Sequence, residues 1–244
     1  MYGASVSFVK PGRNFVPMTQ SPRGSSRQWR KSWRLGDHAQ RTQLIVDVSL
    51  VLLEMESAEG VTTRKVAAML GVGAMTLYTY VKGQPDLRLR MIQRGFEMMR
   101  MHCDSDVPNT TMEHWRRGAA NYINFAVSNP RLYELMFSQP IAGGQKEADA
   151  VAKEFEPFFQ EIRDLLALRG LSEAQLDARA RTVAGRLWIG MHGLASLAIS
   201  GRLDVLKVGV DRVLDDLLEH LGLEEMIAGS ISINKQGPLL DSVG

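Results

Sequence analysis

The sequence predicts an all-α protein with an N-terminal head of three helices and a C-terminal helical bundle. Apolar residues recur at spacings of three and four along most of the chain. Short breaks rich in Gly and Pro separate these segments, and no segment alternates convincingly with the period of a β-strand. A chain of 244 residues can form one large or two modest domains with an ample core.

Residues 1–36 are predicted to form a flexible basic arm. They contain no acidic residue, and three prolines with several Gly and Ser argue against a packed element. The alternative is an extension without a role, or a start codon assigned too far upstream. Four basic residues next to the head are candidates for contacts with phosphates or with a minor groove: Arg27, Arg30, Lys31 and Arg34.

The head is predicted to span residues 37–102. Its first helix, over residues 41–56, has one apolar stripe that includes Ile45, Val48 and Leu52. Thr62 or Thr63 then supplies an N-cap for a second helix, and Gly71 ends it where a positive φ is needed. A further short helix runs to Val81. Two short helices joined by a glycine turn form a helix-turn-helix, whose second helix fits the DNA major groove.

The run TTRKVAAMLGVGAMTLYTYVKGQPDL, residues 62–87, resembles the DNA-binding signature of the TetR (tetracycline-repressor-like) family of transcriptional regulators. The matching features are the Thr pair at 62–63, the Leu-Gly-Val turn at 70–72, the Thr-Leu-Tyr of the reading helix at 76–78, and Val-Lys at 81–82. Their order and spacing hold over nearly thirty consecutive residues, which makes the signal specific.

Residues 103–222 are predicted to form a helical ligand-binding and dimerisation domain, and residues 223–244 a flexible tail. After a linking helix over residues 86–102 and a loop at 104–109, we expect helices at 111–128, from Pro130, at 146–169, 172–200 and 204–221. Pro157 should kink or divide the third of these helices. The family resemblance implies a four-helix dimer interface at about residues 172–221.

The DNA contacts are sorted by role. Thr62 or Thr63 and Arg64 would bind phosphate at a helix N-terminus. Thr76, Tyr78, Tyr80 and Lys82 would contact phosphates, although packing against the first helix is an equal alternative for Tyr80. Base reading falls to Gly73, Ala74, Met75 and Thr79. Because Gly73 and Ala74 carry no hydrogen-bonding side chain, direct readout is thin, and Arg64, the basic arm or DNA shape must add specificity.

The resemblance also implies that the C-terminal domain binds a small-molecule effector. The candidate pocket residues are aromatic, apolar or His side chains expected in the bundle interior, each of which has plain core packing as its alternative: Trp115, Tyr122, Phe125, Met136, Phe137, Phe155, Phe159, Trp188 and His192.

Charge and composition narrow the function. Residues 1–100 carry 15 Lys and Arg against 7 Asp and Glu, whereas residues 101–244 carry 14 against 20. This segregation supports a polyanion at the N-terminal end. The single cysteine, Cys103, excludes an internal disulfide and a cysteine metal cluster. No apolar run could span a bilayer, no convincing secretory signal is present, and no catalytic or cofactor motif occurs. We expect neither an enzyme nor a cofactor or metal, and a cytoplasmic location.

Two functions follow. The first is a dimeric, sequence-specific repressor that binds a near-palindromic double-stranded DNA operator and is released by a small apolar ligand. A dimer is expected because one reading helix contacts too few base pairs for useful specificity, so two reading helices must be presented about 34 Å apart. The alternative is a helical interaction module without sequence-specific DNA binding.

Overall fold

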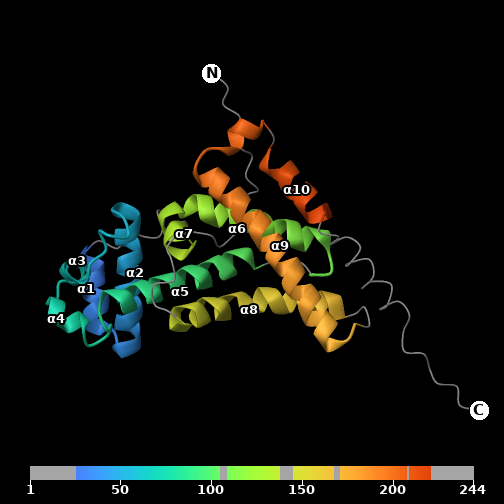
Figure 1. Ribbon diagram of the computed structural model, residues 1–244. Coiled ribbons are helices and arrows are strands. Elements are labelled where there is room, and N and C mark those ends of the chain that lie inside the picture. The colour runs from blue at the N-terminus through green and yellow to red at the C-terminus, as the bar shows by residue number, and fades with distance from the viewer. Residues whose placement is uncertain (1–25, 105–108, 138–144, 168–170, 208, 221–244) are drawn as a thin grey trace, which may run out of the picture. The chain divides into compact units, whose positions relative to one another are not determined.

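The computed structural model of the protein describes residues 26–104, 109–137, 145–167, 171–207 and 209–220 (Figure 1). Every regular element within these ranges is a helix, which confirms the predicted all-α fold. The elements are α1 (Ser26–Leu35), α2 (His38–Met55), α3 (Thr63–Leu70), α4 (Ala74–Leu77), α5 (Gln84–Cys103), α6 (Met112–Ser128), α7 (Pro130–Phe137), α8 (Gln145–Ala167), α9 (Glu173–Ile199), the 3-10 helix η1 (Leu203–Leu206) and α10 (Val210–His220). No helix in the described part of the chain is long and apolar enough to cross a bilayer.

The described residues fall into two compact units. The head unit comprises those within 11–102 and 125–154, and the C-terminal unit comprises those within 103–124 and 155–220. Residues 125–154, which contain α7, therefore group with the helix-turn-helix region, whereas the sequence analysis placed them after the domain boundary. The predicted tail at 223–244 lies outside the described residues.

Helix α1 occupies part of the predicted flexible arm, and this part of the prediction is wrong. Trp33 is only 8% exposed, and its ring lies edge-on to that of Tyr80, with the centroids 5.2 Å apart. The Trp33 carbonyl also accepts a hydrogen bond from Arg41 Nε at 2.9 Å. Tertiary burial of an indole stabilises a helix that its basic composition would not form alone. The arm's three prolines all precede the helix, and residues 1–25 lie outside the described residues.

Helix α2 begins three residues before the predicted start because Asp37 caps it. The Asp37 carboxylate accepts a hydrogen bond from Gln40 N–H at 2.8 Å, and the Gln40 side chain accepts one from Asp37 N–H at 2.9 Å. This reciprocal capping box satisfies two backbone donors at the exposed end of the helix. On the predicted apolar stripe, Ile45 and Val48 are fully buried.

Helices α5 and α7 pack closely within the head unit. A Cβ added to Gly95 of α5 would lie 2.6 Å from Met136 Sδ of α7, so the Met136 side chain occupies the space that a larger residue at position 95 would need. The start of α7 is also tied to the end of α2. Arg131 Nη1 donates to the Glu54 carbonyl at 2.9 Å, and Glu54 Oε1 accepts from Leu132 N–H at 3.3 Å. Helices α2, α5 and α7 therefore form one frame that carries the helix-turn-helix.

The C-terminal unit is held together by buried apolar stripes and by ion pairs between helices. Its fully or nearly fully buried side chains include Ile162, Leu166, Ala180, Leu187 and Leu218. Arg163 of α8 contacts Asp177 of α9 at 2.7 Å, and Arg116 of α6 contacts Asp215 of α10 at 2.7 Å. These pairs are partly exposed, so the burial of the apolar stripes is the main source of stability.

One prediction for the later helices needs correction, and one of the two outcomes predicted for Pro157 is excluded. The predicted helix at 204–221 is interrupted, because Lys207 has a φ of 51°, a left-handed value through which a right-handed helix cannot continue. The chain forms η1 before this residue and α10 after it. Pro157 lies inside α8, which runs without interruption from Gln145 to Ala167 and is not divided in two.

Candidate nucleic-acid interface

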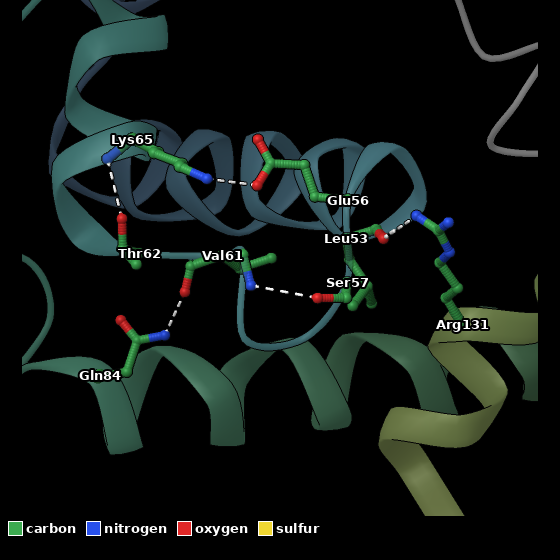
Figure 2. Close-up of polar contacts among 9 residues, drawn as sticks. Leu53, Glu56, Ser57, Val61, Thr62, Lys65, Gln84 and Arg131 are labelled. Atoms are coloured by element: carbon green, nitrogen blue, oxygen red, sulfur yellow. Dashed lines mark hydrogen bonds and ion pairs between the residues drawn. The ribbon is translucent and has the colours of Figure 1, made fainter.

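Helix α3 begins as predicted, with Thr62 as its N-cap. Thr62 Oγ1 accepts a hydrogen bond from Lys65 N–H at 3.3 Å (Figure 2). The hydroxyl still has its own proton to donate to a phosphate, because capping uses only an acceptor lone pair. The side chains of Arg64 and Lys65 are exposed, and Lys65 forms an ion pair with Glu56, whereas Thr63 is half-buried. Arg64 is thus the stronger candidate for a phosphate contact.

The loop before α3 is fixed by the first residue of α5. The Gln84 side-chain amide donates to the Val61 carbonyl, and Val61 itself is buried (Figure 2). Ser57 Oγ accepts from Gly60 N–H at 3.4 Å on the other side of the same loop. The loop that leads into the N-terminus of α3 is therefore fixed by two hydrogen bonds, one at Val61 and one at Gly60.

The turn between α3 and α4 has the predicted glycine conformation. Gly71 has a φ of 71°, and Val72 N–H donates to the Ala67 carbonyl at 3.0 Å, closing the end of α3 with the pattern of a Schellman motif. A residue with a Cβ would be strained at this φ. Gly71 thus sets the direction in which the reading helix leaves the turn.

The reading segment, defined as residues 71–80, has a shorter regular helix than predicted. Helix α4 covers only Ala74–Leu77, after which Tyr78, Thr79 and Tyr80 each donate a backbone hydrogen bond three residues back, at 3.2, 3.3 and 2.8 Å. β-Branched and aromatic residues lose side-chain freedom in an α-helix, which favours this early end. Leu77 is fully buried and holds the segment on the head.

The outward face of the reading segment carries most of the predicted DNA-contacting side chains. Met75 is 80% exposed and Tyr78 is 51% exposed. Gly73, Thr76, Thr79 and Lys82 are also exposed, whereas Ala74 is half-buried. The hydroxyl groups therefore lie outside the core, where they can donate to phosphate oxygens.

Tyr80 is placed differently from Tyr78. Its ring packs against Trp33, at 5.2 Å between centroids, and against His38, at 4.8 Å. Its hydroxyl accepts a hydrogen bond from Arg41 Nη1 at 3.2 Å. Of the two roles left open for Tyr80, these contacts support packing.

Lys82 precedes α5 and is positioned by Asp86. The Asp86 carboxylate accepts from Lys82 N–H at 2.8 Å and forms an ion pair with Arg90 at 3.1 Å. Partial burial opposes ionisation, but the hydrogen bonds from Lys82 and Arg90 outweigh it and lower the pKa of Asp86 below its ordinary value. Asp86 is thus ionised at neutral pH and keeps the end of the reading segment in place.

The structure brings some candidate ligand residues together and separates others. In the C-terminal unit, Phe155 lies edge-on to Trp188, with ring centroids 5.1 Å apart, and the His192 ring lies 6.0 Å from Trp188. Burial lowers the pKa of His192, which is therefore neutral at pH 7. Phe159 packs under the guanidinium of Arg181, 4.6 Å from the ring centroid.

Other members of the candidate ligand set have core positions. Trp115 is 4% exposed and donates from Nε1 to the Asn109 carbonyl at 2.8 Å, and Tyr122 is also buried. The remaining candidates, Phe125, Met136 and Phe137, belong to the head unit, where the Phe137 ring packs against that of Phe96 with the centroids 5.3 Å apart.

A groove in the head unit offers space elsewhere. It encloses about 420 Å³ and is lined by residues of α2 and α5 and by Glu154, and none of the predicted ligand residues lines it. Arg94 in this groove is already paired with Glu97 at 2.6 Å and with Asp47 at 3.9 Å.

Metal and thiol chemistry find no support in the described residues. No group of three or more His, Cys, Asp or Glu side chains that could hold a metal ion occurs among them. Burial and the nearby Asp104 raise the pKa of the Cys103 thiol to about 12, so Cys103 is protonated at neutral pH.

Comparison with known proteins agrees with this architecture. Residues 115–221 match the family described as Tetracyclin repressor-like, C-terminal domain. Over these residues, which are less than half of the chain, the protein resembles the C-terminal domain of tetracycline-repressor-like regulators.

Individual TetR-like relatives resemble parts or most of the chain. The HTH-type transcriptional repressor DrrR1 of Streptomyces coeruleorubidus is 41% identical over 56 residues, which is 22% of this chain. The match spans only about a fifth (21%) of that repressor's length. A TetR-family transcriptional regulator from Streptomyces coelicolor superimposes with a TM-score of 0.58 at 19% identity, covering 84% of this chain and 92% of that chain. A protein of unknown function from Rhodococcus sp. RHA1 superimposes with a TM-score of 0.59 at 16% identity, covering 81% and 97%. At these identities the two structures establish the fold alone.

Proposed function

We propose that the protein is a dimeric, sequence-specific DNA-binding regulator that represses transcription until a small apolar ligand releases it. The observation that carries this proposal is the outward face of the reading segment. Met75 and Tyr78 are exposed there, while Leu77 between them is fully buried and fixes the segment on the head. Exposed hydroxyl and apolar groups on a rigid support suit the edge of a DNA groove.

The proposed contacts keep the roles assigned from the sequence. Thr62, Thr63 and Arg64 would bind phosphate at the start of α3, where backbone N–H groups and the helix dipole attract anions. The remaining proposed contacts are to phosphates from Thr76, Tyr78 and Lys82, to bases from Gly73, Ala74, Met75 and Thr79, and a lesser one from Tyr80.

Dimerisation is supported by one face of α9. A Cβ added to Gly185 or to Gly193 would meet no atom within 4 Å, and Ile189 between them is 68% exposed. Gly190 faces the other way, because its added Cβ would lie 2.5 Å from Leu217. The open glycines and the exposed Ile189 suit close packing against α9 of a second copy, and two reading segments would then face one near-palindromic operator.

Effector binding is supported by the aromatic cluster of Phe155, Trp188 and His192 in the C-terminal unit. Apolar and aromatic walls with one polar group are typical of small-molecule sites. For the ligand to release DNA, residues 103–222 must have two arrangements, only one of which spaces the two heads to fit the operator. The ligand must bind the other arrangement more tightly. A cytoplasmic location is part of the proposal, because the protein would have to reach its operator DNA there.

The experiment is footprinting of the full chain on DNA upstream of its own and neighbouring genes, with excess unrelated DNA present. We expect a sharp, two-fold symmetric footprint that resists the competitor. Met75→Ala tests the reading face, and Met55→Ala is the matched control, since Met55 is 68% exposed on α2. Binding that the competitor abolishes would refute sequence-specific regulation.

The alternative is a helical interaction module without sequence-specific DNA binding. The start of α4 favours this alternative. Its N-cap Gly73 and first residue Ala74 have no side chain that can form a hydrogen bond with a base edge. Competitor-sensitive binding with a steep salt dependence would support this alternative, because any basic surface binds DNA in that way.

A further inference from the structure

Helix α1 has two chemically opposite sides. Its residues turn by about 100° each, which places Arg27, Arg30, Lys31 and Arg34 within an arc of about 100° on one side. Trp29 and Trp33 lie on the other side, and only these two residues of the helix are not exposed. No acidic residue lies within the helix to neutralise the basic side.

The tryptophan side anchors α1 on the head. The Trp33 ring contacts Tyr80, and the Arg41 guanidinium lies 5.5 Å from the Trp33 ring centroid while donating to the Trp33 carbonyl. The link between α1 and α2 is only Gly36 and Asp37. A Cβ added to Gly36 would lie 3.1 Å from the Ser32 carbonyl, so the corner is tight. The basic side is thus held at a fixed position.

Helix α1 contacts the reading segment at both of its ends. At the start, a Cβ added to Gly71 would lie 2.7 Å from Arg30 Nε, so the Arg30 side chain covers the turn before α4. At the end, Trp33 packs against Tyr80. An element that touches residues 71 and 80 of the same segment lies alongside it.

We propose that α1 is a second DNA-binding element, whose outward basic side binds backbone phosphates flanking each operator half-site. The proposal rests on the proposed function and extends it to a surface outside the helix-turn-helix. Arg27, Lys31 and Arg34 are the phosphate ligands, and Arg30 is a positioning residue at the turn. Phosphate is the target because several cations gather on one side of the helix with no acidic residue among them, and a polyanion backbone is attracted to such a surface whatever its sequence.

The test compares the full chain with the triple variant R27Q/K31Q/R34Q, which keeps Arg30 and both tryptophans. Glutamine retains helix propensity and removes charge. Affinity is measured as a function of salt on two duplexes, one trimmed to the footprinted half-sites and one extended by about one helical turn on each side.

We expect the variant to bind the extended duplex roughly tenfold or more weakly at moderate salt, and the slope of log K against log salt to fall by about 2 to 3, since each phosphate contact contributes about 0.9. On the trimmed duplex the difference should shrink. Lysine at positions 27 and 34 (R27K/R34K) should retain affinity, because the contact depends on charge.

The control variant R117Q/R202Q/K207Q removes three exposed charges from the C-terminal unit and should leave affinity and slope nearly unchanged. Thermal unfolding confirms that each variant folds. If the wild-type chain gives a competitor-resistant footprint and R27Q/K31Q/R34Q binds both duplexes with the same affinity and slope, the proposal for α1 is wrong and the proposed function stands. If the wild-type chain gives no such footprint, both are refuted.

Discussion

The reading segment and helix α9 both leave large side chains in solvent, but in different surroundings. Met75 and Tyr78, 80% and 51% exposed, stand among threonine hydroxyls and next to a lysine. Ile189, 68% exposed, stands between two glycines with open space at their Cβ positions. The first surface can donate hydrogen bonds to a hydrated polyanion, whereas the second presents an apolar side chain flanked by two glycines. Exposed apolar area therefore has to be interpreted together with the groups beside it.

The largest expected effect comes from a substitution on the exposed face of α9. Ile189→Glu places a charge in the proposed subunit interface, which desolvation would oppose. We expect a monomer in light scattering and a loss of operator affinity of about 10²- to 10⁴-fold, since only one head can then bind at a time. The thermal stability of the unit should change little, because the Ile189 side chain is exposed.

Met55→Glu is the matched control, because Met55 has the same exposed fraction, 68%, on α2 in the head unit. It should remain a dimer. A dimeric Ile189→Glu variant with unchanged affinity would contradict the assignment of α9 to the interface.

A smaller effect separates the two tyrosines of the reading segment. Tyr78→Phe removes a hydroxyl that we expect to bind phosphate, so operator affinity should fall about two- to tenfold with no change in thermal stability. Tyr80→Phe removes the hydrogen bond from Arg41 and should instead lower the free energy of unfolding by about 1 kcal/mol. Fluorescence anisotropy and thermal melts, run on both variants, give the two readouts. Equal losses of affinity without loss of stability would show that both hydroxyls face DNA.

The smallest expected effect is a loss of folding stability at acidic pH, to which one histidine in each unit contributes. Burial lowers the pKa of His102 in the head unit and of His192 in the C-terminal unit. The folded chain then binds fewer protons than the unfolded chain, so this stability is complete above about pH 6.5 and is lost as the pH falls through the lowered pKa values.

The melting temperature should therefore drop by at most a few degrees between pH 7.5 and pH 5.5. His192→Gln and His102→Gln should each reduce the drop. Melts of the double variant give the background, and a drop of unchanged size in that variant would assign the acid sensitivity to other groups.

The sequence predicts most helices of this fold because their signals are local. The Thr62 cap, the Gly71 stop and the start of α7 at Pro130 all lie within one residue of their predicted places. Each depends on backbone chemistry at the position itself, so neighbours in space are not needed to find it.

The features that the sequence analysis missed depend on contacts between distant residues. Helix α1 forms around Trp33, whose partner Tyr80 lies 47 positions later in the chain; the spacing of Trp29 and Trp33 is the signal that could have indicated it. The same contact decides the place of Tyr80. The left-handed Lys207 has no local signal, since lysine rarely adopts that φ.

The sites themselves were predictable to different degrees. The exposed side chains of the reading segment follow from one short motif, and most of the residues named from it do lie on the outward face of the head. The candidate ligand set came from apolar stripes, which identify buried faces without telling a pocket wall from plain core. The structure accordingly divides that set between the two units.

At Gly95, helices α5 and α7 are in direct contact. The Met136 side chain lies where a side chain of Gly95 would be, so a displacement of α7 must move either that side chain or α5. At its start, α5 carries Gln84, which grips the loop in front of α3. Helix α5 thus links α7, which it contacts near its middle, to the loop before α3, which it contacts at its first residue.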